Sequence, residues 1–154
     1  MIRFPKTHHR QRGAVLAETA VVLPLLIFVI ILTAEVTNAF VDHNTLTKSV
    51  RSGARHVASN AVLGTTGVVQ LRPQLITEAQ NLVVYGSISG GVTAIISGLE
   101  IGDVQVQALA GDNISVSATH NYSGILGPFL PTFGFGADSN LTHTLSATVW
   151  MRAL

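Results

Sequence analysis

Apolar residues dominate the chain from Ala14 to Ala34, where the only charged residue is Glu18. At about 1.5 Å per helical residue, a segment of this length spans roughly 30 Å, the thickness of a bilayer core. The pattern predicts a membrane-spanning helix. After Ala34 the apolar residues stop running continuously, which marks the end of the predicted span.

Beyond the span, apolar and small residues recur at spacings of three and four, while Lys48, Arg51 and Arg55 fall between them. The recurring positions are Val36, Ala39, Phe40, His43, Leu46, Val50, Gly53, Ala54 and Val57. This periodicity predicts that the same helix continues to about Ser59 with one buried stripe.

The remaining residues predict a small domain. Pro73 can start a second helix, helical spacing continues to Tyr85, and Gly86 is a suitable C-terminal cap. Three later segments alternate apolar and polar residues, as strands with one buried face do: 104–108, 114–119 and 141–151.

The turn sequence Ala110–Asn113 joins the first two strands into a hairpin. The predicted fold is α+β. A long N-terminal helix has a membrane-spanning half and an amphipathic half, and the second half packs on an antiparallel sheet of about three strands. Neither the amphipathic half nor the sheet can bury its apolar face alone.

The segment between the second and third strands holds Phe129, Phe133 and Phe135 with few residues to cover them. Two interpretations stay open. The segment either folds back over an edge of the core, or it forms a contact surface for another subunit, because exposed apolar patches mark partner sites.

Charge is scarce and unevenly distributed. Charged residues make up 11% of the chain, against about 25% in a typical soluble domain. Residues 1–13 carry four basic residues and no acid, whereas the rest has five basic and eight acidic residues, a net charge of −3. The basic leader predicts a cytoplasmic N-terminus by the positive-inside rule, and the mildly acidic remainder argues against nucleic-acid binding.

Catalytic and cofactor motifs are not found. The chain has no cysteine, and its histidines do not form a cluster with metal-ligand spacing. Residues 86–90 have the glycines of a nucleophile elbow but Ile88 at the position of the serine. We therefore predict no enzyme activity and no cofactor, and an exported enzyme is the least favoured function class.

The start of the apolar segment has three interpretations. A secretory signal peptide has a shorter apolar core, with Thr37–Ala39 as a weak cleavage site here. An uncleaved signal anchor explains the length and the basic leader. A prepilin-type signal also explains Gly13 and Glu18, since a cut after Gly13 places the new amino group of Ala14 four residues from the carboxylate. Pro24 within the span predicts a kink or a flexible point.

Residues 12–18 (Arg-Gly-Ala-Val-Leu-Ala-Glu) and 22–26 (Val-Leu-Pro-Leu-Leu) resemble the N-terminus of TadE-like pseudopilins, minor pilins of the tight-adherence (Flp) pilus system. Looser similarities are Glu35, Ser52–Arg55, Ala79–Gly86 and Ala147–Arg152.

The resemblance implies cleavage by a prepilin peptidase after Gly13, with Ala14 as the mature N-terminus and Glu18 as the acid used in assembly. Implied partners are other Tad pilins and pseudopilins, the inner-membrane assembly platform and membrane lipid. The implied organisation is leader 1–13, transmembrane helix 14–34, amphipathic continuation 35–60 and periplasmic α+β domain 61–154. The alternative is an uncleaved single-pass inner-membrane protein with a periplasmic binding domain.

Overall fold

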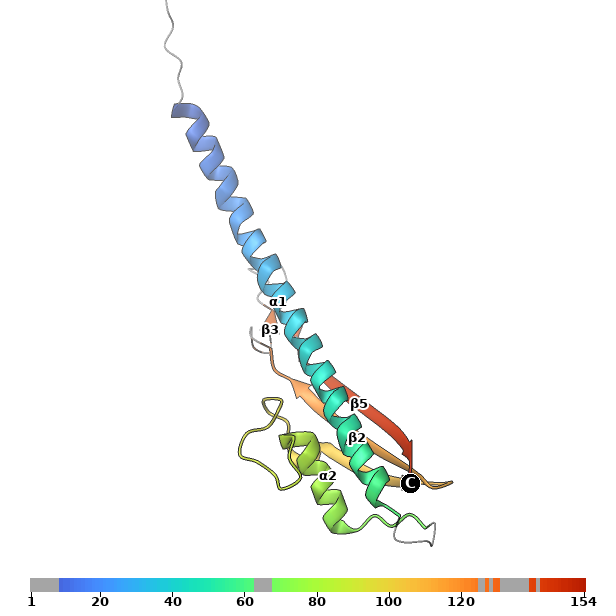
Figure 1. Cartoon of the computed structure of the whole chain (residues 1–154). Coiled ribbons are helices and arrows are strands. Elements are labelled where there is room, and N and C mark those ends of the chain that lie inside the picture. The colour runs from blue at the N-terminus through green and yellow to red at the C-terminus, as the bar shows by residue number, and fades with distance from the viewer. Residues whose placement is uncertain (1–8, 63–67, 125–126, 128, 131–138, 141) are drawn as a thin grey trace, which may run out of the picture. The chain divides into compact units, whose positions relative to one another are not determined.

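The computed structural model describes residues 9–62, 68–124, 127, 129–130, 139–140 and 142–154. The chain divides into two compact units, Met1–Thr37 and Asn38–Leu154, and helix α1 (His9–Asn60) contributes to both (Figure 1). The long helix is confirmed, and it ends one residue after the predicted position. It starts before Ala14 because residues 9–12 contain no helix breaker, so the helix extends into the leader at little cost.

The second unit has two layers. Strands β1 (Val104–Leu109), β2 (Asn113–Tyr122) and β5 (His143–Arg152) form an antiparallel sheet in the order β1-β2-β5. The second half of α1 and helix α2 (Pro73–Tyr85) pack on one face of it (Figure 1), and the short 3-10 helix η1 (Ile101–Asp103) precedes β1. The predicted α+β class, the second helix and the three strands are therefore confirmed.

Two short strands were not predicted. β3 (Phe129–Leu130) pairs antiparallel with β4 (Ser139–Asn140) between β2 and β5, where the sequence predicted no strand. A two-residue strand is too short to give the alternation by which strands are recognised, so the sequence carried no signal for it.

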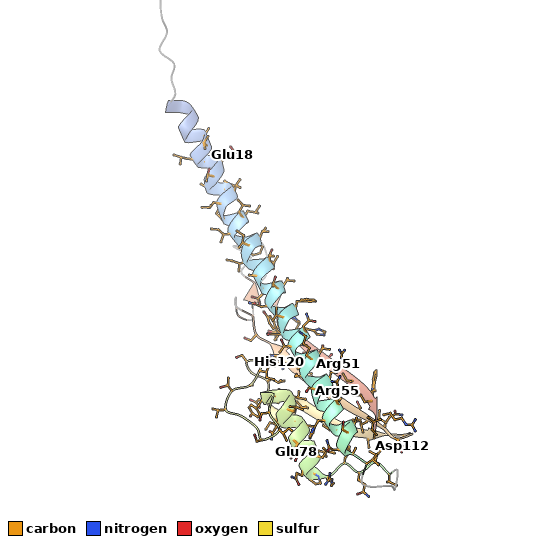
Figure 2. All side chains as sticks on the ribbon, in the orientation of Figure 1. Glu18, Arg51, Arg55, Glu78, Asp112 and His120 are labelled. Atoms are coloured by element: carbon orange, nitrogen blue, oxygen red, sulfur yellow. The ribbon has the colours of Figure 1, made fainter. Side chains whose placement is uncertain are left out.

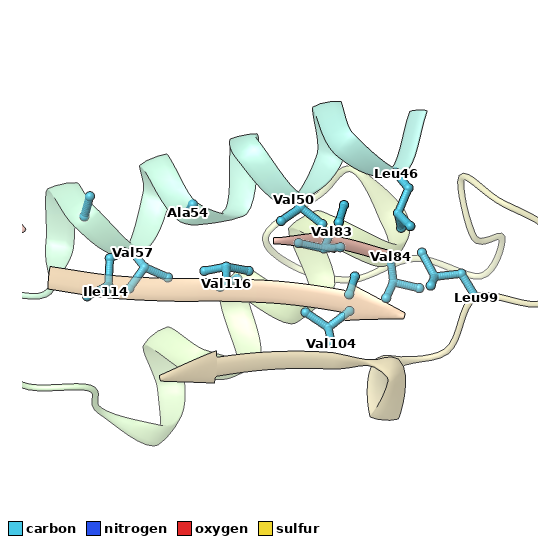
Figure 3. Packing of buried hydrophobic residues seen from close by; sticks show 14 of the residues in the cluster. Leu46, Val50, Ala54, Val57, Val83, Val84, Leu99, Val104, Ile114 and Val116 are labelled. Carbon is cyan, nitrogen blue, oxygen red and sulfur yellow. The ribbon is translucent and has the colours of Figure 1, made fainter. Parts of the chain in front are cut away.

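The core lies between α1 and the sheet. On α1, Val57 and Val50 point toward Ile114 and Val116 of β2, and Leu46 lies further along, near Val84 and Leu99 (Figure 3). Leu46, Val50, Val57, Ile114 and Val116 are fully buried. The predicted stripe is wrong at its beginning. Val36 is 64% exposed and Phe40 66% exposed, because helical periodicity continues along a sequence whether or not another layer covers it.

A close approach of the two helices depends on Gly53. A Cβ atom at this position would lie 2.6 Å from Val83 Cγ2 and 3.3 Å from the backbone oxygen of Ala79. Any side chain here would force α1 and α2 apart, since interiors are packed without spare volume. The side chain of Gln80 then joins α2 to the sheet by donating a hydrogen bond to the carbonyl of Val104 at 3.0 Å.

Turn and cap residues adopt the conformations that the sequence predicts. Gly86 follows α2 with a φ of 72°, and its N–H donates to Leu82 at 3.1 Å. Gly111 and Asp112 connect β1 to β2 with φ values of 72° and 57°. The C-terminus is held by a bond from the Leu154 N–H to the carbonyl of Ala58 at 2.9 Å.

Candidate assembly site in the N-terminal segment

The first part of α1 is exposed apolar surface. Among the described residues, α1 is long and apolar enough to cross a membrane, and none of its most apolar 18-residue window is buried. A core helix of a soluble domain would be largely buried, and this part of α1 is not. Length and composition alone do not separate a membrane anchor from a signal sequence, which makes the residues at its start decisive.

Hydroxyl groups in this segment are satisfied within the helix itself. Thr19, Thr33 and Thr37 each donate to the carbonyl four residues earlier, all at 2.8 Å. Such bonds remove the cost of placing a hydroxyl in hydrocarbon. The threonines are therefore compatible with a lipid environment.

Glu18 differs from these threonines, whose hydroxyl groups bond to their own helix. Its side chain projects from α1 (Figure 2) and borders a shallow groove on one helix face together with Thr19, Val22, Leu23 and Leu26. The carboxylate is exposed and makes no hydrogen bond or ion pair with the described residues. A carboxylate beside apolar side chains is costly in a membrane unless it finds a partner.

Gly13 has no role in packing. It lies inside α1, and a Cβ atom placed there would have no heavy atom within 4 Å. Glycine inside a helix is less favourable than alanine by about 1 kcal/mol. The fold therefore gives no reason for a glycine at this position, in contrast to Gly53.

Pro24 lies within α1, and the helix is continuous through it. Proline has no N–H to donate to the carbonyl of Ala20, so one bond of the helical ladder is missing there. The predicted kink and the predicted flexibility at this proline both stay predictions.

Most of the phenylalanine-rich segment lies outside the described residues. Phe129 begins β3, whereas Phe133 and Phe135 lie outside the described residues. Both interpretations of this segment remain predictions.

The burial of Glu35, whose side chain is 5% exposed, was not anticipated. Two exposed features agree with the sequence pattern. Trp150 alternates with the inward-facing positions of β5 and is 68% exposed on the outer sheet face. Lys48, Arg51 and Arg55 fall between the apolar positions of α1 and are exposed, and Figure 2 labels the two arginines.

Among the described residues, one pair of oppositely charged side chains links the two helices. His56 Nε2 lies 3.1 Å from Glu78 Oε2 between α1 and α2, and Gln74 donates to the other carboxylate oxygen at 3.3 Å. Within the described residues, His, Cys, Asp and Glu form no group of three that could hold a metal ion. The His56–Glu78 pair therefore connects helices.

Taken together, an apolar helix with exposed sides and a two-layer domain at its end fit a membrane-anchored α+β protein. Residues 13–55 match the family described as TadE-like protein. The resemblance to TadE-like proteins is thus confirmed over this segment, which contains Gly13, Glu18 and Gly53. The searches of curated proteins and of solved structures returned no match.

Proposed function

We propose that this chain is a TadE-like minor pilin, or pseudopilin, that supports assembly of the tight-adherence (Flp) pilus. The observation that carries the proposal is the family match, which starts at Gly13 and continues to Arg55. It is supported by the exposed apolar surface of the same helix. Proteins of this pilin family are structural, which agrees with a role in assembly rather than in catalysis.

Cleavage after Gly13 by a prepilin peptidase is the first step of the proposal. In the uncut chain α1 begins at His9 and has no acid in its first turn. A cut after Gly13 makes Ala14 the first residue and brings the positive end of the helix dipole close to Glu18, where a carboxylate is favourable. The absence of a packing role for Gly13 supports selection of this glycine by an enzyme that must reach the backbone.

Glu18 is the assembly acid of the proposal. Its carboxylate pairs with the amino group of Ala14 on an adjacent subunit, which removes the cost of an unpaired charge in lipid and fixes the axial register of the two helices. The groove beside Glu18 offers apolar side chains for the neighbouring helix. Pro24, six residues further on, lets the helix bend during packing.

The proposed topology follows from the charges. The basic leader, residues 1–13, stays in the cytoplasm, residues 14–34 span the inner membrane, and residues 35–60 continue the helix. Residues 61–154 complete a periplasmic domain. Partners are the prepilin peptidase, other Tad pilins and pseudopilins, the assembly platform in the inner membrane and lipid.

One measurement separates the proposal from an uncleaved single-pass membrane protein with a periplasmic binding domain, which the unbroken helix across Gly13 also suits. The protein is extracted from membranes of cells that produce the Tad peptidase, and its intact mass is determined. We expect a chain that starts at Ala14. An intact Met1 would establish the uncleaved alternative, and a start near Phe40 would establish a secretory signal peptide.

A further inference from the structure

From Lys48 to Asn60 the exposed side of α1 carries only positive charge. Lys48, Arg51 and Arg55 are all exposed, and they lie on one helix face because their spacings are three and four. Figure 2 labels the two arginines on α1. Their side chains make no hydrogen bond or ion pair with the described residues. We call this row the basic face.

The stability of α1 does not explain why these three cations lie on one face. Like charges at these spacings destabilise a helix slightly. The dipole at the C-terminus favours cations only in the last turn, and that turn holds no basic residue. Between Asp42 and Glu78 the sequence contains no acid that could pair locally. The three cations are therefore available to a partner outside the chain.

Anionic lipid does not fit well as the partner of the basic face. Headgroups lie just beyond the end of a membrane span, and cations that bind them cluster there. The residues that follow Ala34 instead carry Glu35 and Asp42 and no cation before Lys48. A carboxylate-bearing protein surface fits better.

A second copy of the chain carries such a surface. Once the leader is discounted, the basic face holds three of the five remaining basic residues, so the rest of the molecule has eight acids and only two cations. Glu100 precedes η1 and Asp103 is its last residue, and between them Ile101 is 39% exposed. We call these three residues the acidic corner.

The acidic corner is rigid and has a spacing that matches the arginines. The Glu100 N–H donates to Asp103 Oδ2 at 2.9 Å, and the Glu100 side chain accepts from the Asp103 backbone in return. Three residues of a 3-10 turn separate the two acids by about 6 Å. Arg51 and Arg55, one α-turn apart, are separated by about 5–6 Å. Two carboxylates can therefore meet two guanidinium groups, and each arginine can form a bidentate pair.

We propose that the basic face of one copy docks on the acidic corner of a second copy. The two surfaces differ, so the contact is heterologous, and repetition of it produces an open series of subunits rather than a closed dimer. The contact requires neither cleavage after Gly13 nor the Glu18–Ala14 pair. It goes beyond the proposed function and can hold or fail independently of it.

Cysteine cross-linking tests the contact in membranes, because the natural chain contains no thiol. Two full-length copies with different tags are co-expressed, one carrying Ser52→Cys between the arginines and the other Ile101→Cys. A short bis-maleimide should join the two tags. A copy with Thr148→Cys on the open sheet face replaces the second partner as the control for random collision.

Charge reversal then tests the chemistry. Arg51→Glu with Arg55→Glu should reduce the cross-linked product about tenfold, as expected for lost charge pairs at an interface. Glu100→Arg in the partner copy should restore part of it, and Arg152→Glu, a reversal at the end of β5, should leave it unchanged. Far-UV circular dichroism of each variant confirms that it is folded.

Three results would overturn the proposal. These are equal product with Thr148→Cys, product that is insensitive to reversal of the arginines, and no product although both cysteines react with a monofunctional maleimide. The mass of the N-terminus, measured on the same samples, reports the proposed cleavage separately.

Discussion

The two halves of α1 share one continuous backbone but differ in what covers their side chains. Residues 14–34 are predominantly apolar and mostly exposed, whereas residues 46–57 bury one face against the sheet and leave the other charged. A helix satisfies its own backbone, so both halves can form without help. Neither half, however, can remove its own apolar side chains from water. The second half is covered within the chain, and the first needs lipid or a neighbouring subunit.

Two glycines show the same contrast at single positions. Gly53 allows α1 and α2 to touch, since a Cβ there would lie 2.6 Å from Val83 Cγ2, whereas Gly13 has nothing within 4 Å of such an atom. One glycine is required by packing and the other is not. Substitution of each should therefore affect a different property, which makes the contrast testable.

The largest expected effect is at Gly13. Gly13→Val should abolish processing and leave the precursor in the membrane, because the peptidase must approach a backbone without a side chain. Immunoblotting of membranes for the mass difference of 13 residues measures this. Gly102→Val is a matched control, since Gly102 also has open space around its Cβ position, and it should mature normally. Normal maturation of Gly13→Val would show that cleavage occurs at another position.

Glu18 should affect assembly without affecting cleavage. Glu18→Ala removes the carboxylate that would pair with Ala14 of a neighbour, and alanine is readily accommodated in lipid. We expect full processing and membrane insertion, but loss of piliation and of surface adherence. Glu18→Gln keeps the shape and removes the charge, so it should fail as well. Normal pili in either variant would show that the acid is not used in assembly.

Gly53→Leu should destabilise the second unit. Overpacking of this kind costs about 1–3 kcal/mol, and for a domain of this size that lowers Tm by about 5–20 °C. Thermal circular dichroism of the full chain in detergent measures it. Gly13→Leu in the same assay should leave Tm unchanged. Equal shifts in the two variants would contradict the contrast between the halves of the helix.

The smallest effect is expected at the His56–Glu78 pair. These side chains are 18% and 29% exposed, and a partly exposed pair contributes at most about 1 kcal/mol. A double-mutant cycle with His56→Ala and Glu78→Ala, followed by denaturant unfolding, should give a coupling energy within that limit. A coupling of several kcal/mol would mean that the pair, rather than the close approach at Gly53, holds α1 to α2.

Periodicity predicted most of the fold. The long helix, α2 from Pro73 to its Gly86 cap, the hairpin and the third strand each follow from local spacing and turn chemistry. What failed depends on contacts distant in sequence. Val36 and Phe40 share the spacing of the buried residues, but no pattern within a helix tells where the second layer stops. β3 and β4 are too short to show alternation.

The candidate site was predictable in its residues and not in its environment. Gly13 and Glu18 stand out in the sequence because one precedes an apolar run and the other interrupts it. Whether a side chain fits at Gly53, and whether Glu35 is buried, depends on which atoms lie nearby. Such information is tertiary, and spacing along the chain does not contain it.

Trp150 gives the molecule a built-in optical probe. It is the only tryptophan of the chain, and its ring stands 68% exposed on β5 opposite Ser115, whose side chain is too small to cover it. Because most of the indole lies in water in the folded protein, we expect unfolding to change its emission little. A partner that settles on the outer face of the sheet would shift the emission to shorter wavelength. Tryptophan emission is commonly used to monitor unfolding. In this protein it would instead monitor the binding of a partner to the outer sheet face.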